Sequence, residues 1–411
     1  MSDLQSVAAD GDAEYDAFEA FNRAMGAQGD YSPYADLAAL RTRGDVQPGA
    51  SWMGIEPEDG EPPTLFTAYG YEAVNRVLTD PAFSSAGYAE LMGVVLGRSI
   101  LEMDPPEHRT YRSILQQAFT RREMERWRDE LVGPLLDGMI DGFVADGRVD
   151  LVRELLFPFP VRVIAALLGL PESDLPEFHR LAVQLIGVTA DWDRALVASA
   201  ALREYFATVL AERRRQPADD MVSVLAAADH DGQKLTDEEI FAFCRLLLPA
   251  GAETTYRSSS NLLFGLLTHP GQLAAVTGDR TLLAPAIEEA LRWEPPLLSI
   301  FRTATRDVEL AGVTVPAGAS VSVQIGAANH DDRRWPDPER FDVHRERKAH
   351  IAFASGPHTC LGMHLARMET VAVVERLLDR LPGLRLDPDA PAPFVTGTVF
   401  RAPPRLDVVW G

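Results

Sequence analysis

The amino-acid sequence predicts one large domain that is mostly α-helical and has a minor β portion. Hydrophobic residues make up 46% of the 411 positions, which is enough to bury a large core. Helical periodicity recurs along most of the chain, whereas strand patterns are confined to one stretch after residue 305. No Gly/Ser linker, low-complexity tract or fixed repeat marks a boundary. We therefore expect a single domain over residues 1–411, with residues 1–22 as a flexible acidic N-terminus.

Charge and composition exclude several classes of protein. The first 22 residues are acidic and contain no Lys or Arg, unlike a signal peptide, and prolines interrupt the apolar residues 155–170. Cys244 and Cys360 form no CxxC motif, and without a secretion signal they favour a reducing compartment. A net charge of −22 would repel a phosphate backbone. We expect a soluble cytoplasmic protein with neither nucleic acid nor membrane as a partner.

Two helices are expected in residues 107–128. Apolar residues from Tyr111 to Phe119 follow the spacing of one face of an amphipathic helix. His108 and Arg112 lie one turn apart on another face. A capping-box pattern at residues 120–123 predicts that a second helix begins there.

A long helix is expected next, from a capping-box pattern at residues 236–239 to a stop at residues 269–271. Thirty or so helical residues would extend roughly 45 Å. Midway, Pro249 removes a helix hydrogen bond, Gly251 removes a side chain, and Glu253 places a carboxylate in an apolar segment. Such a cluster predicts a local distortion of the kind that is often functional.

The rest of the chain alternates between helices, strands and irregular segments. A short helix is expected over residues 284–293, and short strands with turns are expected over residues 306–323. These are followed by a Pro- and Asp-rich irregular segment over residues 329–347, a loop into Cys360 and a helix over residues 361–381.

The strongest chemical signal is the segment around Cys360. A lone cysteine is usually a structural core residue. Here Gly356 and Gly362 would let backbone N–H groups approach the sulfur, and the positive end of the following helix would favour a thiolate. These surroundings favour a metal-binding thiolate.

This segment resembles the cysteine loop of the cytochrome P450 family. The matching residues are Phe353, Gly356, His358, Cys360, Gly362 and the Leu-Ala-Arg run at 365–367, whereas Ala354 replaces a usual glycine and Pro357 stiffens the loop. The resemblance implies that Cys360 is the axial ligand of a haem iron. Cys244 lacks such surroundings and is expected in the core.

Residues 249–255 are similar to the oxygen-binding stretch of the same family, although Pro249 and Ala252 depart from its commoner pattern. Cleavage of dioxygen consumes two protons, which a hydroxyl and a carboxylate linked to solvent can deliver. The resemblance assigns these catalytic roles to Thr254 and Glu253. The residues alone leave two alternatives: a Thr254 hydroxyl bonded to its own helix at Ala250, and a Glu253 on a solvated helix face.

Glu289 and Arg292 match the Glu-x-x-Arg motif of the family. An i, i+3 pair taken alone is usually a surface salt bridge. The resemblance implies a buried structural brace behind the cysteine loop, completed by residues 338–341.

Haem carries two propionates, which need cationic partners where they are partly buried. The resemblance implies that His108, Arg112, Arg302 and His358 take this role, and it adds Gly251, Phe353 and Gly362 as further haem contacts. For any one of the four basic residues, a solvated basic face is the alternative.

The family resemblance implies a cytochrome P450 fold with haem b between the long central helix and the cysteine loop. The expected reaction is insertion of one oxygen atom from O2 into an apolar substrate, with electrons from NAD(P)H. A peroxide-driven peroxygenase and a non-catalytic haem sensor remain alternatives. The expected substrate pocket includes Leu246, Ala250, Leu298, Ser299, Ile300 and Val399.

The expected electron donors are a ferredoxin and a flavin-containing ferredoxin reductase. The family's geometry implies that they bind near two basic groups on the proximal side of the haem. These groups are Arg109, Arg121, Arg122 and Arg126, and Arg345, Arg347 and Lys348.

Overall fold

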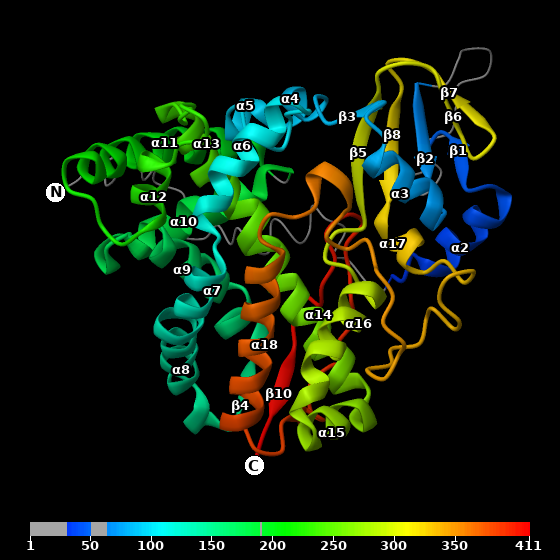
Figure 1. The fold of residues 1–411 in the computed structure, drawn as a ribbon. Helices are drawn as coiled ribbons and strands as arrows, with labels where there is room; N and C mark the ends of the chain where they lie inside the picture. Colours follow the sequence, from blue (N-terminus) through cyan, green and yellow to red (C-terminus); the bar gives the residue numbers. More distant parts are fainter. Residues whose placement is uncertain (1–30, 51–63, 190) are drawn as a thin grey trace.

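The structure is a computed structural model that describes residues 31–50, 64–189 and 191–411 (Figure 1). The acidic segment expected over residues 1–22 lies outside the described residues. The largest sheet lies at one side of the molecule, a smaller sheet lies among the helices near the C-terminus, and helices make up most of the rest, as expected for a mostly α-helical protein with a minor β portion. No described helix is long and apolar enough to cross a membrane.

The helices of the described chain fall along its whole length. They are α2 (Tyr34–Arg43), α3 (Tyr71–Thr79), α4 (Tyr88–Leu91), α5 (Gly93–Leu96), α6 (Glu107–Leu115), α7 (Arg121–Trp127), α8 (Gly133–Asp141), α9 (Pro158–Leu167), α10 (Leu175–Ile186), α11 (Trp192–Arg215), α12 (Met221–Ala227), α13 (Asp237–Leu247), α14 (Thr254–Thr268), α15 (Pro270–Gly278), α16 (Leu283–Trp293), α17 (Ile325–Asn329) and α18 (Met363–Arg380).

The strands form a five-stranded sheet, a three-stranded sheet and a hairpin. The first has the order β1-β2-β8-β5-β3, with only β2 and β8 parallel, and the second has the order β4-β10-β9. Their bounds are β1 (Val46–Pro48), β2 (Leu65–Ala68), β3 (Phe83–Ser84), β4 (Arg148–Asp150), β5 (Ser299–Ala304), β6 (Val308–Leu310), β7 (Val313–Val315), β8 (Ser320–Gln324), β9 (Arg385–Leu386) and β10 (Asp407–Val409). The sequence patterns predicted only β6, β7 and β8, because strands of two to six residues at distant positions carry too little periodicity.

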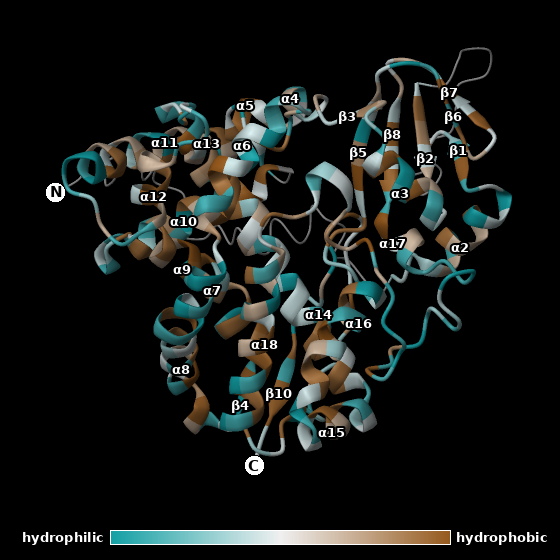
Figure 2. Ribbon diagram, in the orientation of Figure 1, coloured by the Kyte–Doolittle hydropathy of each residue, from teal (hydrophilic) through white to brown (hydrophobic). Residues whose placement is uncertain are grey.

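The core has one large helical part and two smaller parts. Apolar faces of α8 to α16 and α18 meet in the large cluster, and a second cluster lies between the five-stranded sheet and α3. Hydrophobic residues concentrate where the helices face one another (Figure 2). Cys244 is fully buried in the large cluster, as expected for a packing residue.

The expected long helix is present as α13 and α14, joined by a π-helical segment at Leu248–Glu253. Thr236 and Glu239 form the complete capping box that begins it. Pro249 lies in the wide turn, because proline offers no backbone N–H to the regular helix ladder. The predicted midpoint distortion is therefore confirmed, and it brings Ala250, Gly251 and Thr254 onto the more accessible part of the helix.

Candidate active site

The cysteine loop connects the irregular segment after α17 to the start of α18 (Figure 1). A short 3₁₀ turn at Gly356–His358 precedes Cys360, whose backbone N–H donates to the Phe353 carbonyl at 2.9 Å. Ala354 has φ = 57°, a left-handed conformation that glycine adopts more easily. The alanine therefore adopts the backbone conformation that suits the glycine usual at this position in the family.

The two glycines of the loop play different roles. Gly356 has φ = 71°, and a Cβ there would lie 2.6 Å from the Leu78 carbonyl oxygen. At Gly362 a Cβ would meet nothing within 4 Å, so the protein itself does not require glycine there. The expectation that both glycines are needed for close approach within the chain holds for Gly356 alone. Gly362 acts through its backbone N–H, which bonds the Cys360 sulfur.

Cys360 is half-buried, and its surroundings act on the thiol in opposite directions. Burial raises the pKa of Cys360, whereas the N–H of Gly362 and the guanidinium groups of Arg112 and Arg367 lower it. Arg367 is itself fixed by Glu288, with Nε to Oε1 at 2.6 Å, and covers the Phe353 ring at 4.5 Å from its centroid. The N-terminus of α18 adds its positive end next to the sulfur. Burial has the larger effect, so the pKa of Cys360 lies above its ordinary value in the protein alone, and the Gly362 N–H, Arg112 and Arg367 limit that increase without an acidic side chain among them.

The four basic residues expected to hold the propionates come from three separate segments. His108 and Arg112 lie on α6, Arg302 lies on β5, and His358 precedes the cysteine. The His108 and His358 rings contact each other at a tilt of 41° with centroids 4.1 Å apart, which joins α6 to the loop.

The charges of these four groups differ. Burial, followed by the nearby Arg112, lowers the pKa of His108 to about 4. Burial, followed by His108, lowers the pKa of His358 to about 3. Both rings are therefore neutral near pH 7 in the protein alone, and their charge beside two propionates stays a prediction. Arg112 and Arg302 carry the positive charge, and the imidazoles offer N–H donors.

The two arginines lack carboxylate partners within the described ranges, although Arg302 is buried. Arg302 donates to the Phe301 carbonyl at 2.7 Å, and burial lowers its pKa. The neighbouring acid, Asp104, is already bonded by Ser84 and by the Ser85 N–H. Because buried guanidinium groups are normally paired, this arrangement fits the two carboxylates of a haem.

The two residues expected to deliver protons lie side by side at the end of the π-helical segment. The Thr254 hydroxyl donates to the Ala250 carbonyl at 2.7 Å, which is the alternative that the sequence had left open. Glu253 has 1% of its surface exposed, and its Oε1 lies 2.5 Å from Nε of Arg257. The alternative of a solvated helix face is therefore wrong, whereas a link from this carboxylate to solvent stays a prediction.

Arg257 is the site residue that the sequence interpretation missed. It lies one turn after Glu253 in α14, so the i, i+4 spacing of opposite charges was a visible signal. Such pairs are usually exposed, which made the signal easy to dismiss. Here both members are buried, and the guanidinium also lies over the Tyr256 ring at 4.8 Å.

The Glu289–Arg292 brace is buried, as the resemblance implied. Two parallel hydrogen bonds of 2.8 and 2.9 Å join the pair, and Arg292 also donates to the carbonyls of Pro338 and Arg340. The second cation on Glu289 is Arg345, at 3.0 Å. The Arg345 side chain is therefore structural, which removes it from the expected donor-binding group.

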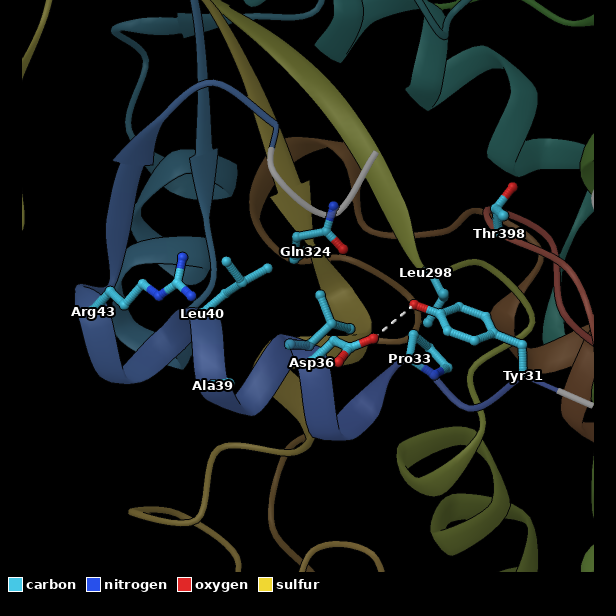
Figure 3. Close-up of a pocket in the computed structure, with 10 residues that line it drawn as sticks. Tyr31, Pro33, Asp36, Ala39, Leu40, Arg43, Leu298, Gln324 and Thr398 are labelled. Atoms are coloured by element: carbon cyan, nitrogen blue, oxygen red, sulfur yellow. Dashed lines mark hydrogen bonds between the residues drawn. The ribbon is translucent and has the colours of Figure 1, made fainter. Parts of the chain in front are cut away.

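The expected pocket residues separate into two groups. Ala250 is exposed in the protein alone, and Ile300 and Val399 are partly so. Leu246, Leu298 and Ser299 are buried. Leu298 packs with Tyr34 and Leu37 in the third core cluster and lines a pocket of about 320 Å³ beside α2 (Figure 3). Its observed role is packing against α2, and its place in the substrate wall stays a prediction.

Comparison with known proteins finds related sequences and structures. A model of the cytochrome P450 family matches residues 184–405. Cytochrome P450 monooxygenase PikC of Streptomyces venezuelae is 37% identical over 364 residues, which cover 86% of this chain and 85% of PikC. Cyclomarin C epoxidase CymV of Salinispora arenicola is 36% identical over 330 residues, covering 77% and 83% of the two chains. The structure of CYP109E1 from Bacillus megaterium in complex with testosterone has a TM-score of 0.84 at 30% identity, covering 93% of this chain and 100% of that chain.

Proposed function

Because this chain belongs to the cytochrome P450 family and is a haem-thiolate monooxygenase, we propose that it inserts one atom of O2 into an apolar organic substrate by hydroxylation or epoxidation. The observation that carries the proposal is the Cys360 loop, in which the Gly362 N–H and Arg112 both favour a thiolate. Arg112 and Arg302, without carboxylate partners among the described residues, support a dianionic cofactor across the same site.

The cofactor in this proposal is haem b. Cys360 binds its iron, Arg112 and Arg302 neutralise its carboxylates, and His108 and His358 donate N–H groups to them. When bound, the haem would supply the oxidising chemistry, and Cys360 as a thiolate ligand would donate electron density to it.

Residues of the long helix handle protons and orient the substrate. Thr254 holds a hydroxyl at the accessible face of the helix, anchored on the Ala250 carbonyl, and Glu253 is the adjacent buried carboxyl group. A positioned donor of this kind contributes about a hundredfold or more to a proton-dependent step. The small side chains of Ala250 and Gly251 leave room for an apolar substrate beside them.

The proposed electron donor is an acidic ferredoxin served by a flavin reductase. The net charge of −22 opposes an acidic partner at long range, but screening beyond about 8 Å at physiological salt makes the local patch decisive. Arg109, Arg122 and Arg347 are exposed and form no ion pair with a described residue. Arg121 and Arg126 pair with neighbouring acids, so they contribute less net charge.

The test uses the holoenzyme with a ferredoxin, a ferredoxin reductase and NADH. Substrates are first screened by shifts of the ferric haem spectrum, with testosterone, a fatty acid and an aromatic compound as probes. Isotopically labelled O2 should then place one labelled oxygen atom in the product. Product formed only with hydrogen peroxide would support the peroxygenase instead. Spectral binding across the panel without any product would support a ligand sensor.

A further inference from the structure

Glu253 uses its two carboxylate oxygens differently. Oε1 accepts from Arg257 at 2.5 Å, whereas Oε2 is buried and has no hydrogen-bond partner in the described part of the chain. Buried carboxylate oxygens are normally satisfied, because leaving one unbonded costs about 1–3 kcal/mol or more. An orphaned oxygen next to the catalytic Thr254 therefore needs a functional explanation.

The Arg257 side chain is buried in a fixed position beside Glu253. Its side chain is 2% exposed, it starts from the same helix as Glu253, and aromatic rings of Tyr256 and Phe400 lie 4.8 and 5.9 Å from the guanidinium carbon. Removal of a charge pair from water is costly, so a pair in this apolar setting is a weak source of stability. The role of the pair is better explained by the protonation state in which Arg257 keeps the Glu253 carboxyl group.

We propose that Arg257 is the positioning residue of the proton relay: it anchors Oε1 and keeps Glu253 ionised, so that Oε2 receives a proton from solvent and passes it toward Thr254. In this step an O–H bond forms at Oε2, and the same bond breaks as the proton leaves, which returns the carboxylate to its pair with Arg257. The Thr254 hydroxyl donates to Ala250, so its lone pairs remain able to accept from Glu253. This inference rests on the proposed relay role of Glu253.

Burial and Arg257 act on the Glu253 carboxyl group in opposite directions. Burial has the larger effect, so the pKa of Glu253 lies above its ordinary value, and Arg257 limits the increase. The other titratable groups that pack here are Tyr256 and His179, which both contact the Phe157 ring. Burial raises the pKa of Tyr256 and lowers that of His179, so both are neutral near pH 7. Without Arg257, burial would leave Glu253 as a neutral acid, which is a poorer proton donor because its pKa lies further above the working pH.

The test compares Arg257→Gln, Arg257→Lys, Glu253→Gln and the double variant Glu253→Gln/Arg257→Gln as holoenzymes. Infrared difference spectra at neutral pH monitor the C=O stretch of a protonated carboxyl group. We expect Arg257→Gln to gain such a band, Arg257→Lys not to gain it, and the double variant to lack it. Burial raises the pKa of Glu369 to about 8, so its neutral carboxyl contributes equally to all variants and cancels in the difference.

The second readout is product formed per NADH consumed. We expect Arg257→Gln to fall to the level of Glu253→Gln and Arg257→Lys to recover most of the coupling. No new infrared band in a folded, haem-loaded Arg257→Gln would overturn the role of Arg257. Full coupling in Glu253→Gln would instead reject the relay role of Glu253, which keeps the two failures distinct. If Arg257→Gln does not fold, Arg257→Lys decides the comparison, because coupling no higher than in Glu253→Gln would overturn the role of the positive charge at position 257.

Discussion

At the scale of single residues, the site contains charged side chains without an opposite charge, and a carboxylate oxygen without a hydrogen-bond donor, in the described chain. Arg112 and Arg302 have no acid partner in the described chain, and Oε2 of Glu253 has no donor. Each would be a defect in an ordinary core. Together they mark where a dianionic cofactor and a mobile proton belong.

The Thr254 hydroxyl should control how efficiently electrons are used. Thr254→Ala removes a positioned donor, so product per NADH should fall by about a hundredfold while reducing equivalents go to peroxide or water. Haem content and substrate binding should change little. Thr255→Ala is the matched control, because Thr255 is the adjacent but buried residue. Equal coupling in the parent and Thr254→Ala would remove Thr254 from the relay.

Arg112 should determine how firmly haem is retained. Charge-assisted hydrogen bonds contribute about 1.5–3 kcal/mol, so Arg112→Gln should release haem roughly ten to a hundred times faster to an excess of apomyoglobin. Arg109→Gln is the control, since Arg109 lies on the same helix but is exposed. Identical release rates for the parent and both variants would exclude a propionate contact at Arg112.

At the scale of secondary-structure elements, short polar connections hold the haem-binding segments in place. Glu289 and Arg292 on α16 bond the backbone at Pro338 and Arg340 and the side chain of Arg345. The brace thereby fixes the irregular segment that leads into the cysteine loop. The tilted ring contact between His108 and His358 joins the same loop to α6.

The brace should contribute strongly to stability. Arg292→Leu leaves Glu289 with Arg345 as its remaining described cation and removes the donor to the carbonyls of Pro338 and Arg340, so it should lower the free energy of unfolding by about 3 kcal/mol or more. Chemical denaturation of the holoenzyme, followed by circular dichroism, measures this loss. Arg203→Gln breaks the exposed pair with Glu238 and should change stability little. A loss in Arg292→Leu no larger than in Arg203→Gln would contradict a structural brace.

Sequence reasoning predicted the long elements better than the short ones. The helices α6, α7 and α13 could be predicted from apolar periodicity over several turns or from capping-box patterns at their first residues. Pro249 indicated the distortion that the structure shows as a π-helical segment. The strands β1, β2 and β3 were missed because their partners lie far away in the chain. The burial of Glu253 and the neutral state of His108 could not be read from sequence, since both depend on neighbours brought together by the fold.

At the scale of the whole molecule, an acidic protein presents a local basic surface. The overall charge of −22 coexists with exposed Arg109, Arg122 and Arg347 near the elements that carry the haem ligand. In the proposed docking, these exposed arginines would attract an acidic donor at short range although the overall charge repels it at long range.

Reversal of charge in that patch should slow electron delivery. Arg109→Glu/Arg122→Glu should lower the rate of haem reduction by ferredoxin at low salt and flatten its salt dependence, because rim charges act mainly on association. Substrate affinity should not change. Arg306→Glu is the control, as Arg306 is exposed beside the sheet. Reduction rates equal to those of the parent at every salt concentration would rule out this docking face.

The central claim, that Cys360 binds haem iron as a thiolate, is tested most directly by the absorption spectrum of the reduced protein with carbon monoxide. The parent should show the band near the wavelength that gives the cytochrome P450 family its name, because the ligand opposite carbon monoxide is a thiolate. Cys360→His should retain haem through Arg112 and Arg302 but lose that band, and Cys244→Ser should keep it, since Cys244 is buried in the core away from the loop. Persistence of the band in Cys360→His, or its loss in Cys244→Ser, would contradict the assignment of Cys360 as the ligand.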